Sequence, residues 1–225
     1  MTASYLLIIV IGLVGLVVQA RLQSVFKKYS HEAFPGGYTG KDVAEKMLHD
    51  NGIFDVKVVA TRGHLTDHYN PATRTVNLSE SVYASASIAA AAVAAHECGH
   101  AIQHAHGYAP LRLRSALVPV IQLSSSLSTW VIILGVVLLN SFPAIFWVGI
   151  AMIAASALFS IVTLPVEVNA SARALAWLRG ARILSPEQME GAETSLRWAA
   201  RTYIVAALSA IATLLYYLGF ARNND

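Results

Sequence analysis

The chain has 225 residues, of which 56% are hydrophobic and only 13% are charged. Soluble globular proteins carry about 25% charged residues, so the composition argues against a soluble enzyme and predicts an integral membrane protein. The formal net charge is a modest +3, and no basic run with interleaved aromatic residues occurs, which argues against nucleic acid as a partner. The single cysteine, Cys98, excludes an internal disulfide.

The first predicted element is a transmembrane anchor at residues 1–20. Residues 3–20 are apolar and uncharged, and the basic residues Arg21, Lys27 and Lys28 follow them. A cleavable signal peptide carries its positive charges before the apolar core, not after it. We therefore expect this segment to stay in the membrane.

Residues 21–116 predict a cytoplasmic α+β portion. A capping box at 39–42 opens a short helix that ends at 51–52, and the alternating pattern at 53–60 is typical of a half-buried strand. Two further short strands, at 65–69 and 74–78, flank a turn and predict a hairpin. Such an exposed strand could hold an extended peptide by strand addition, or it could simply cover the following helix.

That helix, predicted within the alanine-rich run 85–106, carries the sequence His96-Glu97-Cys98-Gly99-His100. Residues four apart lie on one face of a helix, so the two imidazoles can bind one metal ion. Glu97 lies beside them, where it can take a proton from water. This is the H-E-x-x-H pattern of zinc hydrolases.

The remaining chain predicts three more spans. Residues 117–164 form a transmembrane helical hairpin, 165–198 a second cytoplasmic segment, 199–220 a transmembrane helix and 221–225 a tail. The expected fold is therefore mainly α, with about four transmembrane helices and a small α+β, zincin-like cytoplasmic portion. Fifteen of the 16 Lys and Arg fall in 21–116 or 165–201. By the positive-inside rule, the metal site then faces the cytoplasm.

A catalytic zinc usually has three protein ligands, and two residues, His106 and Glu167, compete for the third place. His106 has the spacing of H-E-x-x-H-x-x-G-x-x-H sites, but Gln103 occupies the position where that pattern needs a glycine. His104 lies one turn further along the face and fits a supporting or rim position better. Glu167, at the mouth of the third span, is the preferred ligand because a carboxylate at a membrane helix end indicates a functional site. The alternative is an interfacial Glu167 paired with Arg173.

The chain resembles the bacterial neutral zinc metallopeptidase family, a family of small membrane-embedded proteins. The resemblance covers nearly the whole chain and rests on the H-E-x-x-H segment, on Pro165-Val166-Glu167, and on the segments at 65–71, 77–79, 94–104, 163–171, 173–175 and 199–203. Asn70 and Val168 depart from the Asp and Phe expected there, and neither change touches the chemistry.

The resemblance implies a gluzincin-like zinc metalloendopeptidase in a bacterial plasma membrane, crossing it several times. Zn²⁺ would be held by His96, His100 and Glu167, and peptides or membrane proteins would be the substrates. Zinc would polarise the scissile carbonyl and activate a water, while Glu97 accepts the proton and passes it to the leaving amine. The lipid bilayer is the other implied partner.

The supporting roles are assigned from position alone. A donor to the oxyanion is needed besides zinc, and the residues considered for it are, in order, His68, Tyr69, Arg173 and Tyr203. His68 could equally be a hairpin residue bonded to Asp67. Asn169, Ser171 and His104 are expected to orient the ligands from outside.

Two other classes of function would also fit a membrane protein with a metal site. A zinc-binding membrane scaffold would keep the ligands but would not require an acid at Glu97. A transporter would place charged ligands in mid-span, whereas the interiors of the four predicted spans lack Asp, Glu, Lys, Arg and His. Both observations favour the peptidase.

Overall fold

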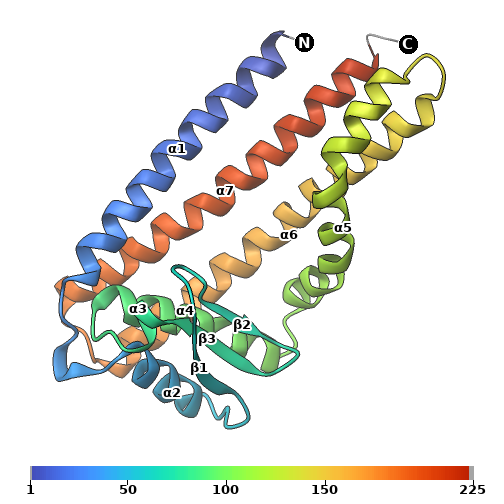
Figure 1. Ribbon diagram of the computed structural model, residues 1–225. Coiled ribbons are helices and arrows are strands. Elements are labelled where there is room, and N and C mark those ends of the chain that lie inside the picture. Colours follow the sequence, from blue (N-terminus) through green and yellow to red (C-terminus); the bar gives the residue numbers. More distant parts are fainter. Residues whose placement is uncertain (1, 223–225) are drawn as a thin grey trace. The chain divides into compact units, whose positions relative to one another are not determined.

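Residues 2–222 are described by a computed structural model, which is mainly helical with one small sheet (Figure 1). This confirms the expected fold class. The α-helices are α1 (Thr2–Ser30), α2 (Gly40–Asp50), α3 (Glu80–Tyr83), α4 (Ile88–Ala105), α5 (Ala109–Val137), α6 (Pro143–Ala181) and α7 (Pro186–Arg222). The strands are β1 (Lys57–Thr61), β2 (His68–Asn70) and β3 (Thr75–Ser79), and a 3-10 turn, η1, covers Pro35–Gly37.

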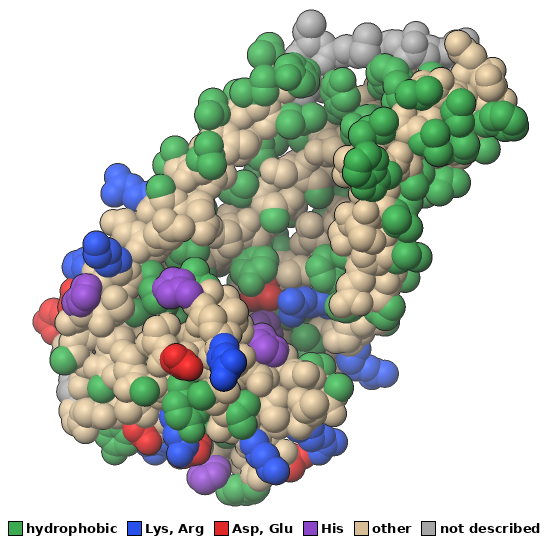
Figure 2. All heavy atoms as spheres, in the orientation of Figure 1, with side chains coloured by type: hydrophobic (Ala, Val, Ile, Leu, Met, Phe, Trp, Pro, Cys, Tyr) green, Lys and Arg blue, Asp and Glu red, His purple; other side chains and the backbone are tan. Residues whose placement is uncertain are grey.

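The protein is a membrane protein with four candidate spans. Tyr5–Ser30 of α1 and the whole of α5, α6 and α7 are long and apolar enough to cross a bilayer. On the face drawn in Figure 2, the side chains over the apolar lengths of these helices are largely hydrophobic. By its internal contacts the chain divides into two compact units, the first comprising Met1–Val17, Arg112–Pro165 and Thr202–Asp225.

Within this first unit, α5 and α6 approach each other closely. A Cβ atom on Gly135 would lie 2.5 Å from the Cα atom of Phe146, which is fully buried. A glycine is required at this position because any side chain would separate the two helix backbones.

The second unit, Val18–Leu111 with Val166–Arg201, carries most of the charged side chains and all eight histidines. Its core is formed by α2 packed on α4. The apolar stripe of α2, which includes Val43 and Met47, is buried against the alanine-rich face of α4. Small side chains on α4 allow this close packing, and the thiol of Cys98 lies 3.5 Å from the carbonyl oxygen of Ala44. The helix with the H-E-x-x-H sequence is therefore fixed from behind.

The sheet has the strand order β1-β3-β2. β2 and β3 pair antiparallel, with Tyr69 opposite Val76, which confirms the expected hairpin. β1 adds to the other edge of β3 in parallel, an arrangement that the sequence pattern did not reveal. β1 is also shorter than the expected strand at 53–60, because Ile53 donates its backbone N–H to Leu48 and so completes the end of α2.

Both ends of α4 are defined by specific residues, and α6 is longer than the sequence predicted. The Ser87 hydroxyl accepts a hydrogen bond from the N–H of Ala90 and caps the start of α4. At its other end, Gly107 adopts a positive φ of 62° and turns the chain away. α6 continues through Pro165 to Ala181 as one helix, so the expected cytoplasmic segment 165–198 begins within a helix. A proline removes one backbone donor, which membrane helices tolerate.

Candidate metal centre

Helix α4 brings His96 and His100 onto one face, as their spacing predicts. Four residues advance a helix by 400°, so the two side chains project only about 40° apart. Their ring centroids lie 4.9 Å apart. His100 is buried, and the side chain of His96 is 13% exposed. The face that carries them is therefore largely closed but still accessible at one side.

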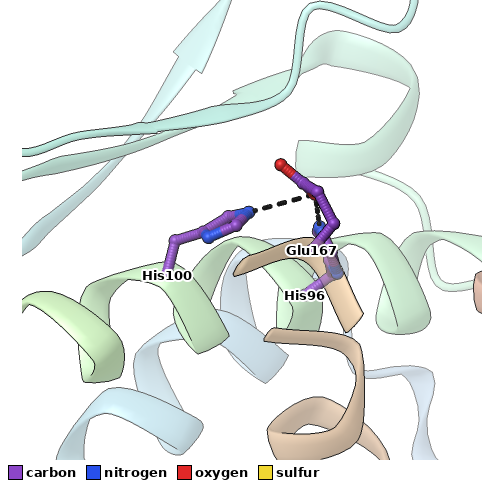
Figure 3. Close-up of side chains that lie close together, drawn as sticks. All are labelled: His96, His100 and Glu167. Atoms are coloured by element: carbon purple, nitrogen blue, oxygen red, sulfur yellow. Dashed lines mark hydrogen bonds and ion pairs between the residues drawn. The ribbon is translucent and has the colours of Figure 1, made fainter. Parts of the chain in front are cut away.

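Glu167 reaches these two imidazoles from α6. Its Oε2 atom lies 3.1 Å from Nε2 of His96 and 3.5 Å from Nε2 of His100. The three side chains point toward one another (Figure 3). One donor atom from each lies within 4.8 Å of the others. Two imidazole nitrogens and a carboxylate oxygen are a donor set that zinc favours, so these residues fit a zinc ion.

The outer nitrogens of both imidazoles are hydrogen-bonded, which frees the inner nitrogens for a metal. Nδ1 of His96 lies 3.0 Å from the hydroxyl of Ser171, and Nδ1 of His100 lies 3.0 Å from Oε1 of Gln103. The Gln103 amide donates to the carbonyl of Val166, so its oxygen must face His100 and accept the Nδ1 proton. Nε2 of His100 is then the nitrogen that is available to a metal ion.

The environment of His100 favours a cation at the same place. Burial by itself lowers the pKa of this imidazole, but the hydrogen bond to Glu167 and the charges of Glu97 and Glu167 outweigh burial and raise the pKa above its ordinary value. A bound metal ion competes with this proton. The carboxylate of Glu97, 8% exposed, thus acts on His100 from the neighbouring position of α4 without belonging to the His96, His100 and Glu167 group.

Gln103 contacts the candidate metal group, and the sequence did not predict this contact. It is fully buried and links α4 to α6, because its amide nitrogen donates both to Val166 and, at 3.0 Å, to Asn169. Asn169 also accepts a hydrogen bond from Nε of Arg173. The sequence feature that could have indicated this role is the position of Gln103, three residues after His100 and therefore about one helical turn away.

We expect Gln103→Leu to weaken zinc binding by about 10- to 100-fold, the range measured for partners that orient metal ligands. Leucine has a similar volume but leaves the His100 Nδ1–H without its acceptor and removes the hydrogen bonds from Gln103 to Val166 and Asn169. Competition with a chromophoric zinc chelator measures the affinity. Gln188→Leu on α7, which lies outside the group, is the matched control, and equal affinities for both variants would contradict the role of Gln103.

Gly99 allows α6 to approach the metal-binding helix. A Cβ atom at this position would lie 2.5 Å from the backbone oxygen of Ala170. Backbone atoms cannot give way as a flexible side chain can, so a methyl group would move α6 and Glu167 away from the histidines.

Gly99→Ala is therefore expected to lower the thermal unfolding midpoint, with an overpacking cost of about 1–3 kcal/mol, and to reduce the zinc content of the purified protein. Gly180→Ala on α6 is the control, since a Cβ atom there meets open space. An unchanged midpoint and zinc content in Gly99→Ala would show that the two helices can separate without consequence.

Cys98 lies between the two histidines in sequence but faces the opposite side of α4. It is fully buried, and burial raises the pKa of its thiol well above the ordinary value. A thiol rather than a thiolate is unreactive. We expect N-ethylmaleimide to leave the folded protein unlabelled at pH 7 and to label one thiol per chain in denaturant, as mass spectrometry would show. Rapid labelling of the folded protein would contradict this placement.

The structure does not bring all the residues named from sequence into this group. His106 is exposed at the end of α4, and its Nδ1 bonds to the backbone oxygen of Ile102. His104 is bonded instead to the hydroxyl of Tyr69, at 2.7 Å. His68 is exposed and bonds to the backbone oxygen of Thr66.

The remaining named residues occupy other positions. Asp67 bonds to the backbone N–H of Ser79, and so does not hold His68. Ser171 contacts His96, while Asn169 and Arg173 belong to the network of Gln103. Tyr203 lies on α7 in the first unit.

Fold and site together define a class of protein: a helical membrane protein with two histidines of an H-E-x-x-H helix and a glutamate from a second helix, which is a zinc-peptidase donor set. Residues 4–222 match the family described as "Putative neutral zinc metallopeptidase", and the chain belongs to this family. It is 40% identical over 206 residues to "Putative membrane protease YugP" of Bacillus subtilis (strain 168), covering 92% of this chain and 91% of that protein. No solved structure matches the chain significantly.

Proposed function

We propose that the protein is a zinc-dependent metalloendopeptidase that hydrolyses peptides or membrane proteins at the membrane surface. The observation that carries the proposal is the convergence of His96, His100 and Glu167 on one point, with Glu97 beside them. The family supports the same reaction type. An acid at position 97 has no part in holding a metal, so it favours an enzyme over a zinc-binding scaffold.

The residues divide the chemistry among themselves. Zinc, when bound, would supply the Lewis acidity that polarises a scissile carbonyl and makes a water molecule acidic. Glu97 would accept the proton from that water and deliver it to the leaving amine. Gln103 and Ser171 would hold the imidazoles in the orientation that presents Nε2.

For the oxyanion, the structure supports Tyr69 better than His68. The Tyr69 hydroxyl meets His104, which lies one turn beyond His100 on the same helix face, whereas the ring of His68 is turned to its own loop. A hydroxyl held by an imidazole is a suitable donor to developing negative charge. We assign this role to Tyr69 and a supporting role to His104.

The proposed active site faces the cytoplasm. The distribution of Lys and Arg supports this orientation. Nearly all of these residues lie in 21–116 and 165–201, the two segments that carry the candidate ligands, and basic residues are enriched on the cytoplasmic side of membrane proteins. In a bacterial plasma membrane, substrates would then be met on the cytoplasmic side.

The experiment is a cleavage assay on full-length protein in lipid nanodiscs, with a diverse peptide mixture read by mass spectrometry. We expect cleavage that 1,10-phenanthroline stops and that stoichiometric zinc restores. Cleavage that resists the chelator, or no cleavage by fully zinc-loaded protein, would refute the proposed function.

A further inference from the structure

A second feature of the unit formed by Val18–Leu111 and Val166–Arg201 is an apolar pocket of about 490 Å³. Sites for small molecules commonly have volumes of about 300–1,000 Å³. The pocket is lined from α1, α3, α4, α7 and the β1–β2 loop, and we call it the α1–α7 pocket. Its main apolar walls are the side chains of Leu22, Phe26, Val93, Leu196 and Ala199.

Two serines of the lining already use their hydroxyl protons within their own helices. The hydroxyl of Ser30 donates to the backbone oxygen of Lys27 at 2.8 Å, and that of Ser195 donates to the backbone oxygen of Gly191 at 2.9 Å. A serine bonded in this way has no proton left to donate to a ligand. The interior of the pocket therefore suits a hydrocarbon chain better than a polar molecule.

The walls from α1 and α7 lie at the level of the lipid headgroups. Residues 3–20 of α1 are uncharged and extend for about 27 Å, close to the thickness of about 30 Å of a hydrocarbon core. The lining residues of this helix follow, within 22–30. On α7 the lining residues, within 195–199, precede the uncharged stretch 202–221. Both helices therefore leave the hydrocarbon core beside the pocket.

Helices α1 and α7 touch at the end of the pocket that is farthest from these uncharged stretches. A Cβ atom on Gly191 would lie 2.6 Å from the ring of Tyr29. From this contact the lining continues for two turns along each helix toward its uncharged stretch, to Leu22 on α1 and to Ala199 on α7. The pocket thus extends toward the bilayer, which is the direction from which a lipid chain arrives.

The charge of the lining complements an anionic headgroup. The lining contains Lys27 and His64 but no Asp or Glu. Lys27 is exposed, and its ammonium forms no ion pair with any residue in 2–222, whereas the ammonium of Lys28 lies 3.8 Å from Glu32. A lysine at the end of a membrane helix extends its ammonium to the headgroup level. Lys27 is therefore available to a lipid phosphate.

From these observations we infer that the α1–α7 pocket binds an anionic phospholipid, with one acyl chain inside the pocket and the phosphate beside Lys27. The acyl chain also contacts Val93, three residues before His96, so the lipid packs on the helix with the H-E-x-x-H sequence. Binding of this lipid requires neither a metal ion nor peptide cleavage. The inference therefore goes beyond the proposed function and can be tested without it.

The first test identifies the lipid that the protein retains. Full-length protein in a mild detergent is mixed with equal amounts of phosphatidylglycerol and phosphatidylcholine that have the same acyl chains, and bound lipid is identified by native mass spectrometry. We expect wild type to retain about one phospholipid per chain and to favour phosphatidylglycerol about fivefold, the strength typical of one basic residue near an anionic lipid surface. Retention of no lipid, or retention without this preference, would overturn the inference.

The second test locates the lipid with two pairs of variants. Ala199→Trp fills the pocket and should abolish retention. Its control is Leu208→Trp, which should retain the lipid because residue 208 projects about 180° from residue 199 on α7 and is 48% exposed. Lys27→Gln should retain the lipid but lose the preference for phosphatidylglycerol. Lys28→Gln, which lies outside the lining, should keep both properties.

Several results would contradict the inference. Equal retention by Ala199→Trp and Leu208→Trp would place the lipid elsewhere. Because Lys27 is at the surface, Lys27→Gln decides the headgroup contact even if Ala199→Trp does not fold, and equal behaviour of Lys27→Gln and Lys28→Gln would indicate general surface charge only. Excess glycerol 3-phosphate should leave the lipid bound, and displacement by it would indicate a phosphate site without an acyl chain. Displacement by a phenylalanine-containing peptide would assign the pocket to peptides instead.

Discussion

Glu97→Gln is expected to abolish peptide cleavage while the protein keeps its zinc. The glutamine amide has the shape of the carboxylate but cannot accept a proton, and general-base catalysis contributes about 10²- to 10⁴-fold to rates. Because Glu97 does not belong to the group formed by His96, His100 and Glu167, its charge is not required to hold the metal. The measurements are initial cleavage rates and zinc content on the same preparation.

The matched control is Glu190→Gln on the exposed surface of α7, which should cleave at the wild-type rate. A Glu97→Gln protein that retains zinc and still cleaves would assign the base to another residue. Loss of zinc together with activity would instead make Glu97 part of the metal site. If wild type bound zinc but never cleaved a peptide, the scaffold alternative would be favoured.

Glu167→Ala should remove the stabilisation that zinc gives to the fold. A ligand that binds only the folded state stabilises it by about 4 kcal/mol when its concentration is 1,000 times Kd. Without the carboxylate only two imidazoles remain, and the weakening should exceed the roughly 10- to 100-fold loss typical of outer partners. We expect added zinc to raise the thermal unfolding midpoint of wild type by several degrees and to leave that of Glu167→Ala unchanged.

Glu193→Ala provides the control for this prediction, since that carboxylate pairs with Arg179 and Arg197 at the surface. Its midpoint should respond to zinc as wild type does. An equal response of Glu167→Ala would mean that the metal is held without α6. The contacts of Glu167 Oε2 with Nε2 of His96 and His100, at 3.1 and 3.5 Å, would then be ion pairs only.

The parts of the molecule that follow from local sequence could be predicted, and those that depend on contacts distant in the chain could not. Helix geometry alone places His96 and His100 on the same face of α4, so their four-residue spacing was sufficient to predict that the two imidazoles meet. The hairpin likewise follows from its turn and its alternating flanks. The parallel pairing of β1 with β3 could not be inferred, because β1 carries no signal that names its partner.

The third ligand and its support show the same limit. Glu167 could be predicted as a ligand from the sequence. A carboxylate among apolar residues at a membrane helix end is energetically costly, so its presence indicates a function. Gln103 is chemically neutral, and its importance comes from burial between His100 and the backbone of α6, which only the folded chain reveals. The α1–α7 pocket, which is lined from α1, α3, α4, α7 and the β1–β2 loop, likewise has no sequence pattern of its own.

The most direct test is the zinc content per chain of protein purified in detergent, determined by elemental analysis for wild type, Glu167→Ala and His106→Ala. A metal centre of His96, His100 and Glu167 predicts about one zinc per chain in wild type and in His106→Ala, and a marked loss in Glu167→Ala. Loss of zinc in His106→Ala, with Glu167→Ala unaffected, would contradict the ligand set. Folded wild type that takes up no zinc would contradict the metallopeptidase itself.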